Sequence, residues 1–394
     1  MSFNFALARL PRIEFGSGRM AMLPDLVAAH GRRVLIVTGA RSFVAGPHWR
    51  NLEQQLAARD IAWEMLQVAG EPSPELVDAC VRENRGSAFS CVLGIGGGSA
   101  LDAAKAIAGL LRPGNSVMEH LEGVGPELPY RGPATPFIAV PTTAGTGSEA
   151  TKNAVLSRQG RDGFKKSFRD ERLVAEYAVI DPDLLADCPL RVLAANGMDA
   201  FTQLLESYVS AKANPFTDAL ALSGMEKARD ALLPWYEGTG NAAGQRAAMA
   251  YAALLSGITL AQVGLGSVHG LAAPLGAFFP IPHGVVCGTL VAEASRVNIA
   301  ALVERSPDHL ALAKYADVGR LLAGRDMPDG EARDALVEIL EDWTRRLHLP
   351  RLAEYGVDAA DVERIVAHSR GSSMKTNPIV LTDQEIAELV RARL

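Results

Sequence analysis

The first half of the chain alternates short apolar runs with segments whose apolar positions recur at helical spacing. β-Branched residues are concentrated in the short runs, and each run is bounded by Gly, Pro or Asp. This alternation predicts parallel strands that are covered by helices. The predicted strands are residues 34–38, 91–95, 137–140 and 178–180.

The strand pattern ends near residue 182, and from about Val192 the chain shows successive amphipathic helices, with Ala-rich examples at residues 219–233 and 246–260. A length of 394 residues agrees with two domains at roughly 150 residues per domain. We therefore predict an α/β dinucleotide-binding domain over residues 1–185 and an all-helical metal- and substrate-binding domain over residues 186–394.

Charge and cysteine content narrow the class of protein. With 39 Lys+Arg and 45 Asp+Glu the formal net charge is -6, which argues against a nucleic-acid partner. The four cysteines form no C-x-x-C pair, as is typical of a reducing cytosol. Arg9 and Arg12 interrupt the N-terminal apolar positions before a signal-peptide core develops. We expect a cytoplasmic protein.

Residues 247–292 contain no Asp, Glu, Lys or Arg. A membrane-spanning helix needs about 20 predominantly apolar residues, so this run is long enough to raise the question. Several Gly and Pro residues break the run, however, and it carries His269 and His283. We interpret it as buried helices with a connecting loop, and we expect no membrane partner.

Two glycine-rich segments follow predicted strands. In the first, Gly94, Gly96 and Ser99 occupy the marked positions of a G-x-G-x-x-G pattern before an Ala-rich helix, an arrangement that can hold a phosphate. The second, PTTAGTGSE at residues 141–149, mixes glycines with hydroxyls that can bond ribose and phosphate oxygens. A tight strand-to-helix turn and a polar interdomain turn are the alternatives. Both segments would lie at the carboxyl edge of one sheet, which favours a dinucleotide site.

The helical half contains candidate metal ligands. Asp199 and Gln203 are four residues apart, which places them on one helical face. His269 and His283 lie in the uncharged run, where a buried imidazole needs a partner or a metal. A hydrogen-bonded core histidine is the alternative for each. Three protein ligands around Zn²⁺ or Fe²⁺ with one open position are typical of a catalytic site.

Taken together, these motifs resemble those of the iron-containing (group III) alcohol dehydrogenase family. The resemblance covers nearly the whole chain, and several motifs occur in the family's order. The matching segments are GGGS at 96–99 with Asp102, PTTAGTGSE at 141–149, NGMD at 196–199, ANPFTDA at 213–219, the segments at His269 and at 282–284, and KTNP at 375–378.

The resemblance implies a two-domain fold like that of dehydroquinate synthase, with a Rossmann-like parallel sheet in the N-terminal domain, an all-α C-terminal domain and an active site in the cleft between them. It also implies NAD or NADP as cofactor and a divalent metal, Fe²⁺ or Zn²⁺. The implied metal ligands are Asp199, Gln203, His269 and His283, of which Asp199, His269 and His283 are also the candidate catalytic residues.

The cofactor residues come from the same resemblance. Gly97, Gly98 and Ser99 would hold the pyrophosphate, Thr142, Thr143 and Ser148 would line the cofactor cleft, and Lys165 would contact the nicotinamide ribose. The remaining predicted cofactor residues are Gly39, Gly96, Asp102 and Thr146.

Three positions depart from the family pattern. Gln203 stands where members commonly carry a histidine ligand, and an amide oxygen is a weaker donor than imidazole. Ala273 stands where many members have a second histidine near the substrate. Gly39 replaces the acid that commonly bonds the ribose 2′-hydroxyl of NAD, and Arg41 and Ser42 can instead donate to the 2′-phosphate of NADP.

These observations predict a metal-dependent NAD(P)-linked oxidoreductase that interconverts an alcohol and an aldehyde or ketone. A metal-independent reductase resembling maleylacetate reductase is one alternative, because Gln203 and Ala273 weaken the ligand set. A lyase resembling dehydroquinate synthase would need a cluster of Lys and Arg that residues 247–292 lack. A catalytically silent dinucleotide-binding protein is the third alternative. The expected partner is a small-molecule alcohol or carbonyl compound, and a homo-oligomer, in particular a homodimer, is expected because an N-terminal edge strand would suit it.

Overall fold

The computed structural model describes residues 4–40 and 42–394, which form two compact units. The α/β unit comprises Ala8–Arg158 and Lys165–Cys188. The helical unit comprises Pro189–Leu394, together with Gln159–Phe164 and residues 4–7. Whether residues 1–185 and 186–394 fold as separate domains stays a prediction.

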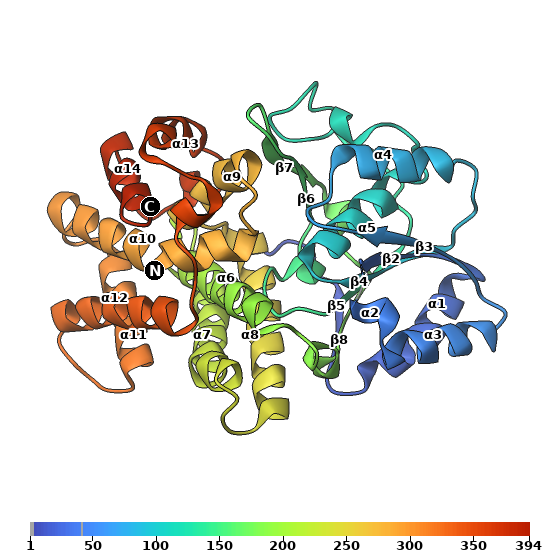
Figure 1. Cartoon of the computed structure of the whole chain (residues 1–394), viewed down its shortest axis with the longest axis horizontal. Helices are drawn as coiled ribbons and strands as arrows, with labels where there is room; N and C mark the ends of the chain where they lie inside the picture. The colour runs from blue at the N-terminus through green and yellow to red at the C-terminus, as the bar shows by residue number, and fades with distance from the viewer. Residues whose placement is uncertain (1–3, 41) are drawn as a thin grey trace. The chain divides into compact units, whose positions relative to one another are not determined.

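A six-stranded parallel sheet forms the centre of the α/β unit, in the order β1-β8-β5-β4-β2-β3 (Figure 1). A separate two-stranded sheet pairs β6 with β7. The strands are β1 (Arg12–Phe15), β2 (Arg33–Gly39), β3 (Ala62–Val68), β4 (Cys91–Gly96), β5 (Phe137–Pro141), β6 (Asn153–Arg158), β7 (Phe164–Arg169) and β8 (Tyr177–Ile180).

The four strands that the sequence predicts are β2, β4, β5 and β8, and their parallel pairing is confirmed. These strands are buried on both faces, so their sequences are nearly continuous apolar runs. The sequence analysis did not predict β1, β3, β6 or β7. Each of these strands lies at a sheet edge or in the small sheet and carries exposed polar residues that interrupt the apolar pattern.

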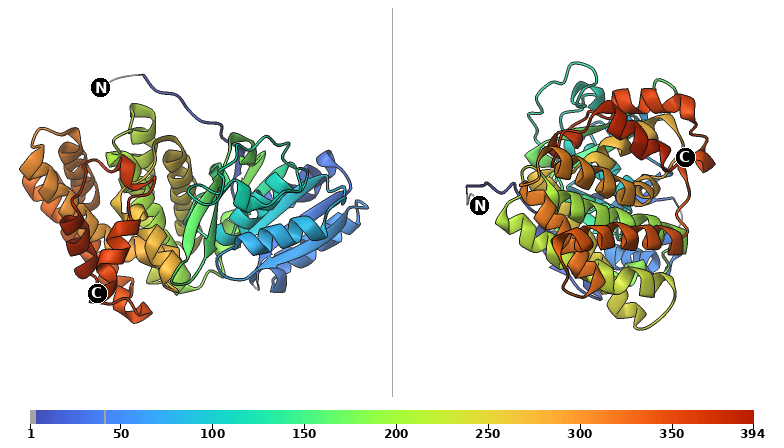
Figure 2. Two further views of the ribbon diagram at one scale, coloured as in Figure 1. Left: turned by 90° about the horizontal axis from the view of Figure 1, so that it is seen from above. Right: turned by 90° about the vertical axis from the view of Figure 1, so that its left-hand side faces the viewer.

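Helices cover both faces of the six-stranded sheet (Figures 1 and 2). Val34 and Ile36 of β2 pack with Leu23, Val27 and other residues of α1 and α3 in one core, whereas α4 and α5 lie on the opposite face. The helices of this unit are α1 (Leu23–His30), α2 (Ser42–Ala45), α3 (Pro47–Ala57), α4 (Pro74–Glu83) and α5 (Gly98–Leu110), with the 3-10 helices η1 (Arg19–Met22), η2 (Val117–Glu119), η3 (Ser148–Ala150), η4 (Glu171–Leu173) and η5 (Pro182–Leu185).

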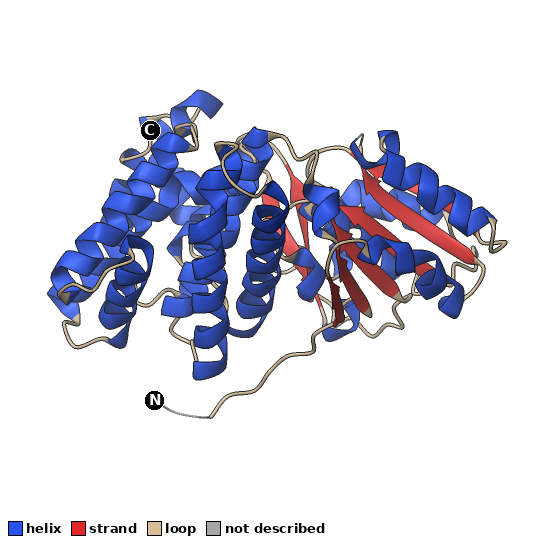
Figure 3. Ribbon diagram, turned by 90° about the horizontal axis from the view of Figure 1, so that it is seen from below, coloured by secondary structure: helices blue, strands red, loops and turns tan. Residues whose placement is uncertain are grey.

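The segment Pro189–Leu394 consists of helices and loops, as Figure 3 shows. This confirms the predicted all-helical C-terminal architecture. The helices are α6 (Leu190–Val209), α7 (Pro215–Tyr236), α8 (Ala242–Val263), α9 (Ser267–Phe278), α10 (His283–Arg305), α11 (Leu310–Ala323), α12 (Asp329–Arg346), α13 (Val362–His368) and α14 (Asp383–Arg391), with η6 (Leu352–Tyr355), η7 (Ala359–Asp361) and η8 (Met374–Thr376).

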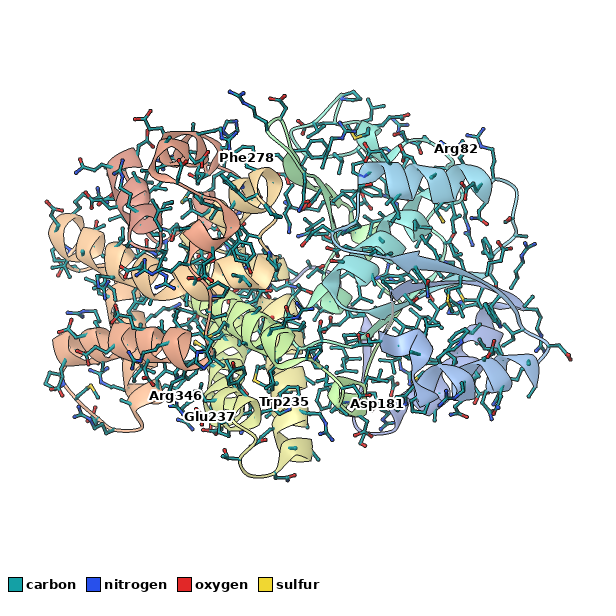
Figure 4. All side chains as sticks on the ribbon, in the orientation of Figure 1. Arg82, Asp181, Trp235, Glu237, Phe278 and Arg346 are labelled. Atoms are coloured by element: carbon teal, nitrogen blue, oxygen red, sulfur yellow. The ribbon has the colours of Figure 1, made fainter. Side chains whose placement is uncertain are left out.

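Helix α6 is the central helix of this unit and packs against α7, α8 and α10. The start of α7 is set by sequence, because Asn214 caps the helix by accepting from the backbone of Phe216 and Thr217. At the other end of α7, Glu237 accepts a hydrogen bond from Arg346 of α12 at 2.6 Å (Figure 4). These contacts fix both ends of α7, one of the helices that pack against α6.

Two helices of this unit, α8 and α10, are long and apolar enough to cross a membrane by length and composition alone. The share of each apolar window that is buried within the structure is 61% for α8 and 72% for α10. A core helix of a soluble protein meets the same criteria, so the two helices are weak evidence for a membrane span. The predicted run without charged residues covers most of α8, all of α9 and the start of α10.

The close packing of α11 against α12 yields a test of this fold. A Cβ on Gly319 would lie 1.8 Å from the backbone oxygen of Ala332, and a backbone atom cannot move aside as a flexible side chain does. We expect Gly319→Ala to lower the free energy of unfolding by at least about 2 kcal/mol in urea titrations. Gly330→Ala, in the first turn of α12 with open space around the new Cβ, is the matched control and should be neutral or slightly stabilising. Equal effects of the two substitutions would contradict this packing.

Candidate functional site

One face of α6 carries a row of buried polar side chains. Asp199, Gln203 and Glu206 follow one another at intervals of four and three residues, so all three point the same way. All three are buried, and Asp199 has no exposed surface. A helix in the centre of the unit therefore presents two carboxylates and an amide to its neighbours α9 and α10.

The two histidines of the uncharged run meet Asp199 in the structure. His269, near the start of α9, places Nε2 at 3.2 Å from Asp199 Oδ1. His283, the first residue of α10, places Nε2 at 3.7 Å from the same oxygen. The structure thus brings together Asp199, His269 and His283, three of the four residues predicted as metal ligands.

Glu206 contacts the His269 ring at Nδ1, the nitrogen opposite the one that faces Asp199. Its Oε2 lies 2.6 Å from His269 Nδ1, and its Oε1 accepts the backbone N–H of Val268 at 2.7 Å. A carboxylate beside Nδ1 favours a proton on that nitrogen, so Nε2, which faces Asp199, would be the ring nitrogen available to a metal ion. The sequence analysis missed Glu206, although its seven-residue spacing from Asp199 places both on one helical face.

Cys287 is a further member of this cluster that the sequence analysis missed. Its Sγ lies 3.5 Å from His269 Nε2 and 3.7 Å from His283 Nε2. One ligand atom from each of Asp199, His269, His283 and Cys287 lies within 4.8 Å of the other three. The signal was available in the sequence, because Cys287 is four residues after His283 in one helix.

Gln203 lies at the edge of the cluster. Its Nε2 donates to Asp199 Oδ1 at 3.4 Å, and its Oε1 accepts from Ser256 of α8 at 2.7 Å. The amide is therefore oriented with its nitrogen, not its oxygen, toward Asp199. An amide nitrogen is not a metal ligand, so the structure places Gln203 near the cluster without presenting its oxygen to it.

Opposing effects set the charge state of these buried groups. Burial alone would raise the pKa of Asp199, but the charges and hydrogen bonds of His283 and His269 hold it below its ordinary value. Burial disfavours protonation of His269, yet Cys287, Glu206 and Asp199 together raise its pKa well above the usual value. Burial raises the pKa of the Cys287 thiol to about 12. The cluster thus combines two carboxylates, Asp199 and Glu206, with imidazoles in the interior of the helical unit.

The cluster could hold a divalent metal ion. Asp199 Oδ2 is buried and has no hydrogen-bond partner among the residues that the structure describes. A buried carboxylate oxygen without a partner is costly, and a cation would remove that cost. The combination of carboxylate, imidazole and thiol donors suits Zn²⁺ and Fe²⁺.

The two glycine-rich segments lie together at the carboxyl edge of the sheet in the α/β unit. Gly96 ends β4 and pairs in register with Pro141, the last residue of β5, and Gly96 O accepts from Thr142 N at 3.0 Å. Helix α5 begins immediately afterwards, and no side chain among the described residues caps its N-terminus. Uncapped N–H groups at a helix start can bind a phosphate.

Threonines of the second segment pack against the glycines of the first. A Cβ on Gly97 would lie 3.2 Å from Thr143 Oγ1, and one on Gly98 would lie 2.7 Å from Thr146 Oγ1. Glycine is required at position 98 because any side chain there would displace Thr146. Gly39, at the end of β2, lies beside Gly96, and a Cβ added to Gly39 would meet only open space.

A buried lysine that the sequence analysis missed joins the two segments. Lys105 of α5 donates through Nζ to Ser148 O at 2.8 Å, Thr151 Oγ1 at 2.9 Å and Asn153 O at 2.6 Å. Asp102 lies 3.5 Å from the same ammonium and accepts from Ser148 Oγ and from Val155 N. Burial lowers the pKa of Lys105 and raises that of Asp102, and each charge partly offsets this effect on the other.

The remaining predicted cofactor residues differ in their surroundings. Ser99 lies in the first turn of α5, beside Gly98. The Nζ atom of Lys165 in β7 forms an ion pair with Glu71 at 3.0 Å. This contact does not connect Lys165 to the glycine-rich segments. Arg41, which the sequence analysis assigns to a 2′-phosphate, lies outside the described residues.

Comparison with known proteins identifies the class to which this fold and these sites belong. Residues 11–182 match the family model of the iron-containing alcohol dehydrogenases, and residues 193–394 match the C-terminal model of the Fe-containing alcohol dehydrogenase family. The chain belongs to the iron-containing alcohol dehydrogenase family. It is an enzyme of this class, which interconverts alcohols with aldehydes or ketones.

Individual relatives match over almost their full length. The chain is 31% identical to alcohol dehydrogenase 4 of Saccharomyces cerevisiae over 97% of each chain. It is also 31% identical to lactaldehyde reductase of Escherichia coli K12, over 95% of this chain and 96% of the relative. The solved structure of sulfoacetaldehyde reductase from Bifidobacterium kashiwanohense in complex with NAD⁺ matches 100% of this chain and 99% of its own, with 25% identity and a TM-score of 0.83.

The buried Lys105–Asp102 pair can be tested by a double-mutant cycle. We expect Lys105→Met to lower the free energy of unfolding by about 3 kcal/mol, because it leaves the partly buried Asp102 carboxylate without its cation. Asp102→Asn in the same chain removes the uncompensated charge and should restore part of this loss. Urea titration of the four proteins measures the coupling, and strictly additive effects would contradict a direct interaction.

Proposed function

We propose that the protein is an NAD(P)-linked alcohol dehydrogenase and aldehyde reductase whose metal ion is held by Asp199, His269 and His283. The observation that carries this proposal is the convergence of these three side chains, with Asp199 Oδ2 buried and without a hydrogen-bond partner among the described residues. A reductase that binds no metal would gain nothing from a buried carboxylate oxygen without a hydrogen-bond partner.

The protein residues prepare the site for the reaction. A divalent metal, when bound, supplies Lewis-acid chemistry that polarises a carbonyl oxygen or favours ionisation of an alcohol. Asp199 contributes negative charge in a water-poor interior, where electrostatic attraction to a cation is strong. Glu206 fixes the ring of His269 so that Nε2 faces Asp199 and would serve as the ligand atom for the metal. The apolar residues of α9 and α10 keep the surroundings dry.

The cofactor site that we propose is the carboxyl edge of the parallel sheet. Gly97, Gly98 and Ser99 at the start of α5 would bind the pyrophosphate through backbone N–H groups. Thr142, Thr143 and Thr146 flank that loop, and the Lys105 network, which includes Asp102 and Ser148, holds it in place. Gly39 would lie near the adenosine ribose, and Lys165 near the nicotinamide ribose.

The substrate is proposed to be a small alcohol or carbonyl compound. Relatives of this chain are named as an alcohol dehydrogenase, a lactaldehyde reductase and a sulfoacetaldehyde reductase, so small aldehydes are the first candidates. Ala273 lies one helical turn after His269, where a methyl group replaces the imidazole found in many members. The missing side chain removes a polar contact and favours a substrate that differs from the commonest short-chain alcohols.

Cellular location and assembly are part of the same proposal. None of the four cysteines, all of which lie within the described residues, forms a disulfide, and this supports a reducing cytoplasm. Strand β1 is an edge strand that pairs only with β8 among the described strands. An open edge of this kind supports a homodimer formed through that side of the sheet.

The metal assignment can be tested with Asp199→Asn, which preserves the shape of the side chain but removes its charge. We expect metal content after dialysis, measured by atomic emission, to fall by at least tenfold and turnover to fall with it. Affinity for NAD(H) should stay unchanged, because the glycine segments belong to the other unit. Full metal content together with full turnover in this variant would favour the metal-independent alternative.

Cofactor preference can be tested at Gly39. Since no carboxylate occupies this position, we expect the parent enzyme to use NADP(H) within about tenfold of NAD(H) in kcat/KM. Gly39→Asp places a charge where a 2′-phosphate would lie, and the open space there accommodates the side chain. We expect this variant to shift preference toward NAD(H) by at least about tenfold.

Gly39→Asn is the control for this experiment. It has the same shape without the charge, so it separates electrostatic repulsion of the 2′-phosphate from a steric effect. Preference for NAD(H) by more than about a hundredfold in the parent enzyme would show that a residue other than Gly39 controls the choice.

A further inference from the structure

Four donor atoms, not three, surround the point at which the Asp199 carboxylate faces the two imidazoles. In a tetrahedral site with metal–ligand distances of about 2.0–2.3 Å, nitrogen and sulfur ligands lie about 3.6 Å apart and nitrogen and oxygen ligands about 3.3 Å apart. Cys287 Sγ lies 3.5 and 3.7 Å from the Nε2 atoms of His269 and His283. Asp199 Oδ1 lies 3.2 and 3.7 Å from the same two nitrogens. These four edges are close to the lengths expected around one tetrahedral ion, and all four donor atoms lie within 4.8 Å of one another.

Gln203 does not complete this tetrahedron. Asp199 Oδ1 is an acceptor, so the facing amide group is most stable with its nitrogen on that side. Ser256 of α8 occupies the amide oxygen. The Gln203 amide therefore orients the Asp199 carboxylate, and the amide oxygen points away from the four donor atoms.

The chemistry of the donor atoms favours sulfur as the fourth donor, because a thiolate is a softer ligand than an amide oxygen. Thiolate ligands also favour Zn²⁺ over harder divalent ions.

We infer that Cys287, and not Gln203, is the fourth protein donor of the metal site, so that the site has an Asp-His-His-Cys ligand set that prefers zinc. This inference rests on the proposed function, since it assumes that the cluster binds a metal. It assigns to Gln203 the role of a positioning residue for Asp199. It also explains how the chain tolerates glutamine where other members of the family commonly carry a histidine.

Cobalt substitution tests the inference directly in the full-length protein. A thiolate bound to Co²⁺ gives a strong sulfur-to-cobalt absorption band in the near ultraviolet, which oxygen and nitrogen donors do not give. We expect this band in the parent protein, in Gln203→Met and in Cys188→Ser, the last of which controls for loss of a cysteine outside the cluster. Cys287→Ser should lose the band and bind Zn²⁺ at least tenfold more weakly in a chelator competition.

The outcomes separate this inference from the proposed function. Cobalt binding without the band in the parent protein, or a band that persists in Cys287→Ser, overturns the assignment of Cys287 and leaves the proposed function standing. Failure of the parent protein to bind either Co²⁺ or Zn²⁺ overturns both. If Cys287→Ser does not fold, X-ray absorption of the zinc-loaded parent decides: one sulfur at about 2.3 Å supports the inference, and a shell of only nitrogen and oxygen overturns it.

Discussion

The burial of the Asp199 carboxylate is the constraint around which the helical unit is built. A charge without exposed surface loses several kcal/mol of hydration, so opposite charge or hydrogen-bond donors must surround it. On α6 itself Gln203 donates one long hydrogen bond, and the second buried acid, Glu206, adds no positive charge, so most of this compensation comes from other helices. The starts of α9 and α10 therefore bring His269 and His283 to it, and α8 supplies Ser256 to orient Gln203.

Sequence patterns predicted the parts of this structure that depend on local order. The strands β2, β4 and β5 are buried on both faces, and this produces the continuous apolar runs from which they were predicted. The four-residue spacing of Asp199 and Gln203 correctly placed both on one helical face. Family resemblance was needed to pair Asp199 with His269, because their contact closes a long loop of chain that no local pattern records.

The parts that sequence reasoning missed depend on contacts between distant segments. Strand β3 alternates exposed and partly buried positions at a sheet edge, so neighbouring strand β2 determines its conformation more than its own pattern does. Lys105 belongs to an Ala-rich helix and is recognisable as a structural cation only when Ser148 and Asn153 are seen beside it. Cys287 and Glu206 had suitable spacing, but a thiol and a carboxylate have many ordinary roles in helices.

The absence of charged side chains over residues 247–292 affects how readily the unfolded chain aggregates. In the native unit most of the apolar windows in α8 and α10 are covered. In an unfolded or partly folded chain the same segments are exposed, and no like charges repel one molecule from another. Gatekeeper charges, which commonly limit self-association of such segments, are missing over this whole length. Newly synthesised chains therefore depend on rapid folding to avoid aggregation. For the native protein, the rate of unfolding determines how quickly these segments become exposed on heating, and so governs its resistance to aggregation.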